Sequence, residues 1–424
     1  MDIYVVQLGD NIEEIANKYG ITVERLISDN GMINPYSLVV GQTIVILYPK
    51  VTYIVKQGDT LTTIADSNEI SIMQLMRNNS FLFDREFIYP DESLVISYNT
   101  VKDIQVNAYT YVFPSQDILR RALPYLTFIS IFNYRIVEDA NIINFGDDSE
   151  IIRLAEEYDT IPLLMISTLS LTGEDLKVES IYKILLDNEQ QDKLINGMLQ
   201  IIRSKGFKGI NVFISNITEY NQSLYLNVFA KLSMALRNEG YIFFITITTN
   251  YTSTNENLDY QSISFLVDRI IFLQNIWEMR KQPPAPISDI SLIRQFIDHI
   301  TSKVSPNYIS LGKPLVGLGW DLSFIPNLPL AKLLSLNSTI TLAYDQRAVI
   351  QLDDVSQNSY FNYMEYTENH IVWFIDARSI KALDEIIIEY DLVGTGLWFL
   401  TSYNQQLYSI INATFNILKL HDEI

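Results

Sequence analysis

The 424-residue sequence has no cysteine and only three histidines. Without cysteine, neither a disulfide framework nor a thiolate for catalysis or metal binding is available. The three histidines are His299, His370 and His421, and they stand apart without the spacing of metal ligands. We therefore expect no metal site and no other cofactor.

Positive charge is also scarce. The chain has 30 lysines and arginines against 50 aspartates and glutamates, which gives a formal net charge of −20. Nucleic acids and anionic membranes bind concentrated positive charge, so this composition excludes both as partners. A neutral ligand or a basic protein partner fits the charge better.

Long apolar runs are missing as well. The longest, such as residues 241–246, fall far short of the roughly 20 residues that a membrane-spanning helix needs. The chain begins Met1-Asp2-Ile3, without a basic segment followed by an apolar one, so no secretory signal is visible. The sequence alone therefore predicts a soluble protein, cytoplasmic unless another feature places it elsewhere.

The first hundred residues contain a repeat. Residues 4–12 (YVVQLGDNI) align with residues 53–61 (YIVKQGDTL) at a shift of 49, and the later parts of the two copies align at a shift of 50. Each copy has the pattern of a strand, a Gly-Asp turn, two helices, an Asn-rich loop and a strand. We expect Asp10 and Thr60 to act as helix N-caps.

This pattern, Y-x-V-x-x-G-D-x-[IL]-x-x-I-A followed by L-x-x-x-N, resembles the lysin motif (LysM), a βααβ module that binds N-acetylglucosamine-containing glycans. The resemblance implies one repeat over residues 1–49 and a second over 50–99. In that family the sugar lies between the loop after the first strand and the loop before the second. The implied groove residues are Asp10, Asn11, Ile12, Gly31, Met32 and Ile33 in the first copy, and Asp59, Thr60, Leu61, Ser80, Phe81 and Leu82 in the second.

Two features leave that assignment open. Ile12 and Leu61 are also candidates for the core of each repeat, and the polar loop residues for helix caps. The second copy departs from the pattern, because it has Pro90-Asp91-Glu92 where Gly-Gln is usual and an apolar loop at residues 80–83. We therefore expect the two copies to differ in binding.

After residue 100, apolar runs of five to eight residues alternate with amphipathic segments. Eight candidate strands with helices between them predict an α/β fold, a (β/α)8 TIM barrel over residues 100–424. A long gap before the last strand predicts a small α+β insertion at about 318–390, with strand-like segments at 340–343, 349–352, 360–367 and 370–375. The barrel strands are expected at 106–111, 127–132, 161–167, 209–214, 242–248, 269–273, 309–317 and 394–400.

Four local strings carry a second resemblance. IPLLMIS (161–167), ISLGKPLVG (309–317), VWFIDARS (372–379) and GTGLW (394–398) are similar, in their order and spacing, to the chitinase-like barrel of glycoside hydrolase family 18. With LysM repeats in front, the arrangement resembles that of bacterial spore-cortex N-acetylglucosaminidases. The resemblance covers about residues 101–421.

The family's catalytic motif, D-G-x-[DN]-x-D-x-E on the fourth barrel strand, aligns with KGINVFIS at residues 208–215. Only Gly209 and Asn211 match. Lys208 replaces the first Asp, Phe213 replaces the Asp that supports the substrate acetamide, and Ser215 replaces the Glu that protonates the leaving oxygen. A missing general acid alone lowers the rate by a factor of about 10² to 10⁴.

The sixth strand also departs from the family, which has Met-x-Tyr where this chain has Leu273-Gln274-Asn275. A cleft can still bind a glycan after the catalytic residues are lost, because aromatic faces pack on pyranose rings. Trp398 matches the family's tryptophan floor, and Trp320 and Trp373 are expected near the same mouth. The residues expected in such a residual cleft are Asn211, Trp320 and Trp398. The alternative is that Phe213 fills this floor and Trp398 is structural.

Three functional hypotheses follow. The first is a non-catalytic, pseudoenzyme-type protein that binds peptidoglycan or chitin-like glycan on a bacterial spore or cell wall. The second is an active N-acetylglucosaminidase on spore-cortex peptidoglycan, with its acid moved to Glu219, Glu278 or Asp321. The third is a scaffold with a protein partner in a coat or other assembly.

Overall fold

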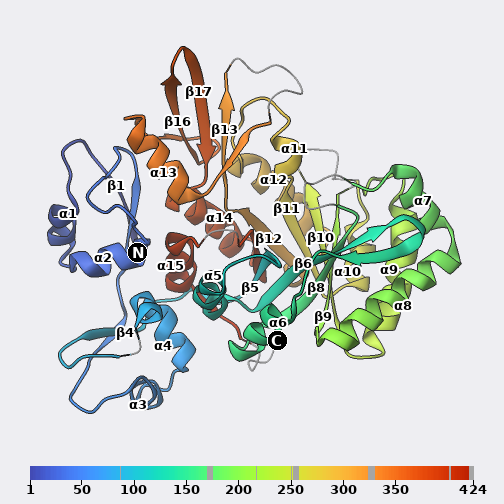
Figure 1. The fold of residues 1–424 in the computed structure, drawn as a ribbon, viewed down its shortest axis with the longest axis horizontal. Coiled ribbons are helices and arrows are strands. Elements are labelled where there is room, and N and C mark those ends of the chain that lie inside the picture. Colours follow the sequence, from blue (N-terminus) through green and yellow to red (C-terminus); the bar gives the residue numbers. More distant parts are fainter. Residues whose placement is uncertain are drawn as a thin grey trace.

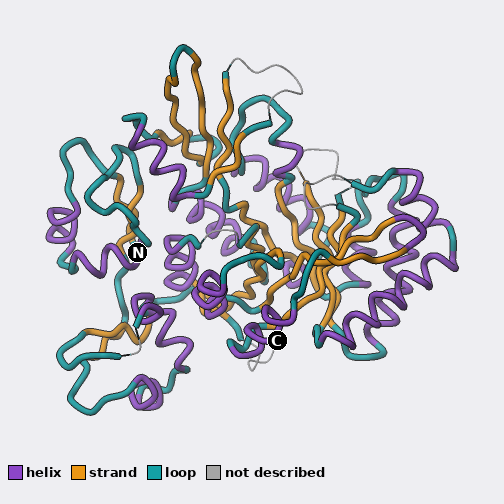
Figure 2. The backbone as a smooth tube through the Cα atoms, in the orientation of Figure 1, coloured by secondary structure: helices purple, strands orange, loops and turns teal. Residues whose placement is uncertain are grey.

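The computed structural model describes residues 1–85, 87–169, 175–215, 217–249, 251, 257–322, 330–400 and 403–419. Two small α+β units lie at one side of a closed barrel (Figure 1). Helices surround the barrel strands, and a separate antiparallel sheet stands at one end (Figure 2). Over the described ranges, none of the helices has both the length and the apolar character needed to cross a membrane.

The first repeat folds as predicted, with one correction. It comprises β1 (Asp2–Val5), α1 (Ile12–Tyr19), α2 (Val23–Asn30) and β2 (Thr43–Ile46), and its two strands pair antiparallel. The N-cap of α1 is Asn11, whose side chain accepts from the Glu14 N–H. The prediction of Asp10 as this cap was wrong, because its carboxylate instead accepts from the Tyr4 hydroxyl.

The second repeat has the same order of elements plus one turn of 3-10 helix. Thr60 is the predicted N-cap and accepts from the Thr63 N–H at 3.1 Å. Asn79, at the end of the second helix, donates to the Val95 carbonyl and so ties that helix to the last strand. The elements are β3 (Val51–Ile54), α3 (Leu61–Ser67), α4 (Ile72–Asn78), η1 (Ser80–Asp84) and β4 (Ser93–Ser97).

Eight parallel strands form the barrel, which confirms the predicted fold. Each pairs with the next in chain order, and the pairing of the first strand with the last closes the ring. The eight are β5 (Lys102–Tyr111), β6 (Phe128–Val137), β8 (Ile161–Ser167), β9 (Gly209–Ile214), β10 (Ile242–Thr249), β11 (Arg269–Gln274), β12 (Ile309–Pro314) and β18 (Gly394–Trp398). Short strands extend the sheet at β7 (Asn141–Asn144) and β19 (Phe415–Ile417).

Side chains alternate between two cores along these strands. Ile210 and Ile214 of β9 belong to the outer core beneath the helices, whereas Phe213 belongs to the core inside the barrel. The outer layer consists of α5 (Gln116–Ala122), α6 (Ser149–Glu157), α7 (Val178–Leu186), α8 (Asn188–Lys205), α9 (Gln222–Arg237), α10 (Tyr260–Leu266), α11 (Ile276–Met279), α12 (Ile290–Thr301), α14 (Ala377–Glu389) and α15 (Gln405–Thr414), with 3-10 turns η2 (Leu123–Tyr125), η3 (Glu138–Ala140) and η5 (Pro306–Tyr308).

The insertion is an antiparallel sheet with one helix. The sheet order is β14-β13-β17-β16-β15, and α13 (Leu336–Asp345) packs beside it. The predicted strand at 340–343 was wrong: Ile340 and Ala343 lie three residues apart on one face of α13, a spacing that fits a helix as well as a short apolar run. The strands are β13 (Gly317–Asp321), β14 (Lys332–Leu334), β15 (Gln351–Asp353), β16 (Asn358–Glu365) and β17 (Glu368–Phe374).

The insertion also ends earlier than residue 390. Leu383 and Ile387 of α14 are buried in the same outer core as Leu311 of β12. This helix therefore belongs to the barrel's repeating unit, and the inserted sheet ends with β17.

Both repeats dock on α15. Gln406 donates from Nε2 to the Thr43 carbonyl of the first repeat at 2.7 Å. Asn412 accepts from Arg77 Nε of the second repeat at 3.1 Å and donates to Asn78 Oδ1 at 2.8 Å. Polar contacts thus hold the two repeats against the C-terminal helix of the barrel.

Candidate functional site

Strand β9 is the fourth barrel strand, as the sequence predicted. Gly209 pairs with Ile242 across a very close approach, since a Cβ added there would lie 2.3 Å from the Ile242 carbonyl oxygen. Asn211 points into the barrel, where it donates to Ser130 Oγ and accepts from Thr246 Oγ1, both at 2.9 Å. The side chain is fully buried, so Asn211 belongs to an interior polar network.

An aromatic cluster fills the space above this network. The ring of Phe213 stacks on that of Trp398, with centroids 5.3 Å apart and planes at 26°. The edge of Trp277 packs against both rings. Phe213 is 2% exposed and Trp398 is 4% exposed. The packing therefore favours the interpretation in which Phe213 occupies the floor and Trp398 is structural.

The other two tryptophans named from the sequence lie on the inserted sheet. Trp320 is 3% exposed, and its indole N–H donates to the Gln282 carbonyl at 2.9 Å. Trp373 packs against the same cluster and lies 4.7 Å, centroid to centroid, from the Tyr360 ring. Trp320 and Asn211 are both buried, which contradicts their prediction as residues of an open barrel cleft.

Ser215 has a carboxylate partner that sequence reasoning missed. Its hydroxyl donates to Asp175 Oδ2 at 2.8 Å, and both side chains are half-buried. Asp175 precedes α7, after the third barrel strand. Both residues follow barrel strands, and the carboxyl ends of barrel strands meet at one face of the barrel. Their positions after predicted strands are the one sequence signal that could have brought them together.

Tyr225 of α9 lies near this pair. Burial, and secondarily the negative charge of Asp175, raise the pKa of Tyr225 well above its ordinary value. The phenol therefore stays neutral.

The remaining substituted positions have ordinary structural partners. Lys208 precedes β9, and its Nζ lies 2.9 Å from Glu156 Oε1 with both side chains about half exposed. Asn275 caps α11 by accepting from the Glu278 N–H at 3.2 Å. Lys208 lies at the amino end of the strand, whereas Ser215 follows its carboxyl end. The Asn275 side chain is engaged by the backbone N–H of Glu278.

The three predicted alternative acids lie on different elements. Glu219 is exposed in the segment after β9, and Asp321 ends β13 of the inserted sheet. Glu278 is exposed on α11, next to Trp277, and accepts from Lys281 Nζ at 2.9 Å. The structure does not gather them around Ser215 as it does Asp175.

The histidines have separate surroundings. His370 stacks on Tyr363 with centroids 4.8 Å apart, His299 lies 2.8 Å from Lys303 Nζ, and His421 lies outside the described residues. Where the structure is described, no three His, Asp or Glu side chains form a group that would hold a metal ion.

The predicted groove of the first repeat divides into buried and exposed residues. Ile12 is fully buried against Leu26 and Ile44, so its assignment to the groove was wrong. Asp10 and Asn11 are occupied as hydrogen-bond acceptors. The loop after α2 turns toward the barrel. Gly31, with φ 60°, approaches Gln405 of α15, Met32 is half-buried, and Ile33 is 70% exposed.

The second repeat turns part of its predicted groove toward the first. The Ser80 and Ser28 hydroxyls lie 2.9 Å apart across the contact between repeats. Phe81 lies beneath the guanidinium groups of Arg25 and Arg85. Leu82 is 2% exposed in the repeat's core. Burial contradicts the groove assignments of Ser80 and Leu82, whereas Leu61, at the start of α3, remains partly exposed.

Both repeats share a Tyr–Asp hydrogen bond. Tyr4 donates to Asp10 at 2.6 Å, and Tyr53 donates to Asp59 at 2.9 Å. The Tyr4 hydroxyl, and next the Gln7 N–H, lower the pKa of Asp10. For Asp59 the Lys56 N–H is the larger cause of a lowered pKa and the Tyr53 hydroxyl the second. These carboxylates therefore stabilise the turn before the first helix of each repeat.

Comparison with known proteins gives two family matches. The profile of the LysM domain matches residues 4–47 and 53–97, and the profile of glycosyl hydrolases family 18 matches residues 124–402. Both agree with the described βααβ units and the barrel.

Some relatives match this chain over nearly the whole length of both chains. The cortical fragment-lytic enzyme of Bacillus subtilis is 29% identical over 433 residues, and its namesake from Bacillus anthracis is 26% identical over 431 residues. Each match covers 99% of both chains. The crystal structure of the Bacillus cereus spore cortex-lytic enzyme SleL aligns with a TM-score of 0.80 and 26% identity over 99% of both chains.

Proposed function

Because the chain belongs to glycosyl hydrolases family 18 and carries two LysM domains before its barrel, we propose that it binds N-acetylglucosamine-containing glycan without hydrolysing it. The observation that carries this proposal is the pair of side chains at the end of β9. Phe213 is packed on Trp398, and the Ser215 hydroxyl donates a hydrogen bond to Asp175.

The chemistry of these residues supports the loss of hydrolysis. A serine hydroxyl does not ionise near neutral pH and cannot supply the general acid that glycoside cleavage requires. A phenyl ring offers no charge to the oxazolinium ion that forms from the substrate acetamide. Its stacking on Trp398 also takes the volume where a sugar ring would pack.

The relatives' names support the choice of glycan and of location. They are cortical fragment-lytic and spore cortex-lytic enzymes, so peptidoglycan of the spore cortex or cell wall is the proposed ligand, ahead of chitin. We place the protein on the spore or wall surface, where a protein partner in a coat is a further proposal.

The test pairs binding with turnover. The full chain is incubated with insoluble peptidoglycan, cortex fragments or chitin, and the bound fraction and the released sugar ends are measured together. Binding without release supports the proposal. A protein that binds none of the three polymers would contradict it.

A retained glycosidase is the second candidate, and the contact between Ser215 and Asp175 specifically favours it. Asp175 holds a carboxylate one hydrogen bond from the position that the family gives to its acid. In this candidate Asp175 acts in its protonated form: its proton passes to the Ser215 oxygen while the Ser215 hydroxyl proton passes to the glycosidic oxygen, which leaves Asp175 as the carboxylate. If so, Asp175→Asn should abolish turnover while Glu219→Gln, Glu278→Gln and Asp321→Asn leave it unchanged; no turnover in the unaltered chain excludes this candidate.

A further inference from the structure

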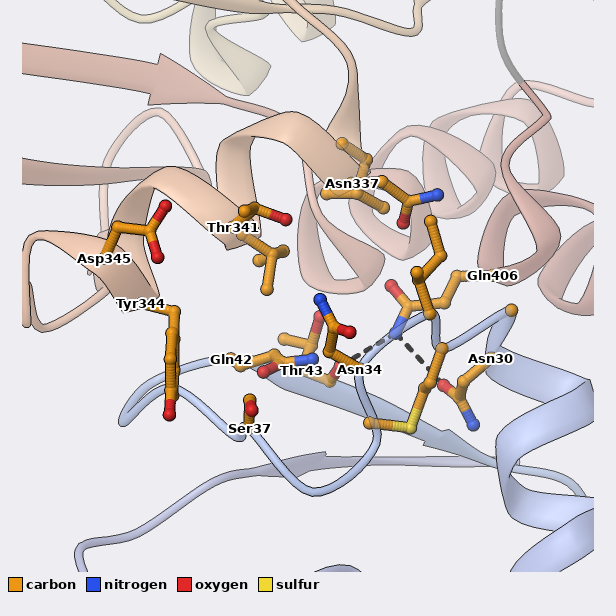
Figure 3. A pocket seen from close by; sticks show the side chains of 15 residues that line it. Asn30, Asn34, Ser37, Gln42, Thr43, Asn337, Thr341, Tyr344, Asp345 and Gln406 are labelled. Carbon is orange, nitrogen blue, oxygen red and sulfur yellow. Dashed lines mark hydrogen bonds between the residues drawn. The ribbon is translucent and has the colours of Figure 1, made fainter.

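A cavity of about 240 Å³ lies between the first repeat and the inserted sheet (Figure 3). One wall is the loop that joins α2 to β2. The facing wall is α13, and Gln406 of α15 closes one end. Gly31, Met32 and Ile33 of the predicted LysM groove line this cavity, whereas Asp10, Asn11 and Ile12 do not. The second wall is therefore α13 of the insertion and not the loop before α1. Its volume is somewhat below the roughly 300 Å³ of small-molecule pockets, which suits one sugar unit.

The lining is rich in uncharged hydrogen-bonding groups. It contains five carboxamides, from Asn30, Asn34, Gln42, Asn337 and Gln406, together with several hydroxyls. Among the described residues that line it, Asp345 contributes the one charge and there is no lysine or arginine. This composition suits a neutral polar ligand and disfavours an anionic one.

Part of the lining is fixed by contacts within the protein. Gln406 Nε2 donates to Asn30 Oδ1 at 3.0 Å and to the Thr43 carbonyl at 2.7 Å, as the dashed lines in Figure 3 show. Asn30 also donates to the Leu26 and Val45 carbonyls. These residues hold the two walls together and are not available to a ligand.

The other polar groups remain available. The side chains of Asn34, Asn337 and Thr341 form no hydrogen bond with any residue of the described ranges; Asn34 comes from the loop wall, and Asn337 and Thr341 come from α13 (Figure 3). Tyr344, on the α13 wall, is 49% exposed. Carboxamides pair with sugar hydroxyls and acetamido groups, and a tyrosine face packs on a pyranose ring.

We propose that α13 is one half of a glycan site whose other half is the α2–β2 loop of the first repeat. The ligand class is a neutral oligosaccharide with acetamido groups, and the inference rests on the proposed function. A bound glycan then bridges the repeat and the barrel, because Asn34 and Asn337 come from different domains. Met32 and Ile340 supply the apolar surface beneath the ring.

Titration of the full chain with the soluble N-acetylglucosamine tetramer, followed by calorimetry, tests this site. Tyr344→Ala and Asn337→Leu should each weaken binding about fivefold, the effect of about one lost hydrogen bond or ring contact. The control is Tyr220→Ala, which removes a tyrosine that is 88% exposed on the barrel and should leave affinity unchanged. Thermal unfolding checks that each variant folds.

Hydrogen exchange on the unaltered chain gives an independent readout. The tetramer should slow exchange in both residues 31–37 and residues 336–345. Binding that protects only the first segment, or that both variants leave unchanged, overturns this inference while the proposed function stands. An unaltered chain that binds neither tetramer nor peptidoglycan contradicts both.

Discussion

Phe213 lies near the end of β9 with its side chain in the barrel interior, and Ser215 directly follows the strand, two residues later. The ring of one is packed among Trp277 and Trp398, and the hydroxyl of the other is bound to Asp175. Each position that the family uses for chemistry therefore has a structural partner here.

The packing of Phe213 gives the first prediction. Phe213→Ala removes a buried ring and leaves a cavity against Trp398, so it should lower the free energy of unfolding by about 3–5 kcal/mol. Phe265→Ala, at a side chain that is 67% exposed on α10, is the control and should change it by less than about 0.5 kcal/mol. Urea unfolding measures both. A small change for Phe213→Ala would show that the floor is not filled.

A second prediction concerns the Tyr–Asp pairs. The pKa of Asp10 and of Asp59 is lowered in the folded state, so their stabilisation is full above the ordinary value of 3.8 and is lost as pH falls through the lowered pKa. Asp10→Asn with Asp59→Asn should flatten the fall of the melting temperature below pH 4. Asp66→Asn, an exposed carboxylate on α3, is the control. Equal acid sensitivity in both variants would contradict the assignment.

The position of β9 and its two faces were predicted correctly from the sequence, because side chains alternate along a strand and this alternation determines which residues point inward. Asp175 escaped prediction because its contact with Ser215 joins two βα segments that lie 40 residues apart. Ile12 and Leu82 were assigned to a groove by resemblance, whereas their burial depends on how tightly each small repeat packs.

Among the elements, α2 makes the connection between the repeats. Arg25 donates to Asp29 within α2, to the Asn78 carbonyl and Asn79 Oδ1 of the second repeat, and to the Tyr98 hydroxyl. Desolvation by burial raises the pKa of Asp29, and Arg25 opposes that shift. The guanidinium thus neutralises a buried carboxylate and bridges two domains.

Replacing this bridge tests its role. Arg25→Met keeps the length of the side chain but leaves Asp29 without its cation, so unfolding should become easier by about 3–5 kcal/mol. Arg153→Met on α6 is the matched control, because that arginine pairs with Glu150 and Glu157 at the solvent-exposed surface. This change should lower the free energy of unfolding by about 1 kcal/mol at most. Guanidinium unfolding compares the two. Equal effects would mean that Arg25 is not a bridge.

Hydrophobic periodicity predicted the type of element, helix or strand, correctly for the long segments. Periodicity failed at residues 340–343, because four apolar and small residues fit a strand and a helix equally well. The capping of α13 by Ser335, which accepts from the Ser338 N–H, was the local signal that decides for a helix.

The whole molecule joins its N-terminal repeats to its C-terminal helix. Gln406 and Ser409 of α15 hold the first repeat through the Thr43 and Asp29 carbonyls. The Ile350 N–H donates to the Val40 carbonyl and adds the insertion to the same contact. No local pattern in the first hundred residues reports partners that lie more than 300 residues later, so this docking was not predicted.

Loss of that docking should be measurable. Gln406→Ala with Ser409→Ala leaves buried carbonyls unpaired, at about 1–3 kcal/mol each, and should speed hydrogen exchange in β2 without affecting β9. Gln116→Ala, which removes an exposed contact with Glu150, is the control. Unchanged exchange in β2 would show that the repeat is held by other contacts.

The most direct test of the central claim uses one preparation of spore-cortex peptidoglycan fragments and the unaltered chain. Co-sedimentation gives the bound fraction, and mass spectrometry of the supernatant gives any newly cleaved muropeptides. The account predicts bound protein and no cleavage above that of a heat-denatured sample. Cleavage products that disappear in Asp175→Asn would contradict it.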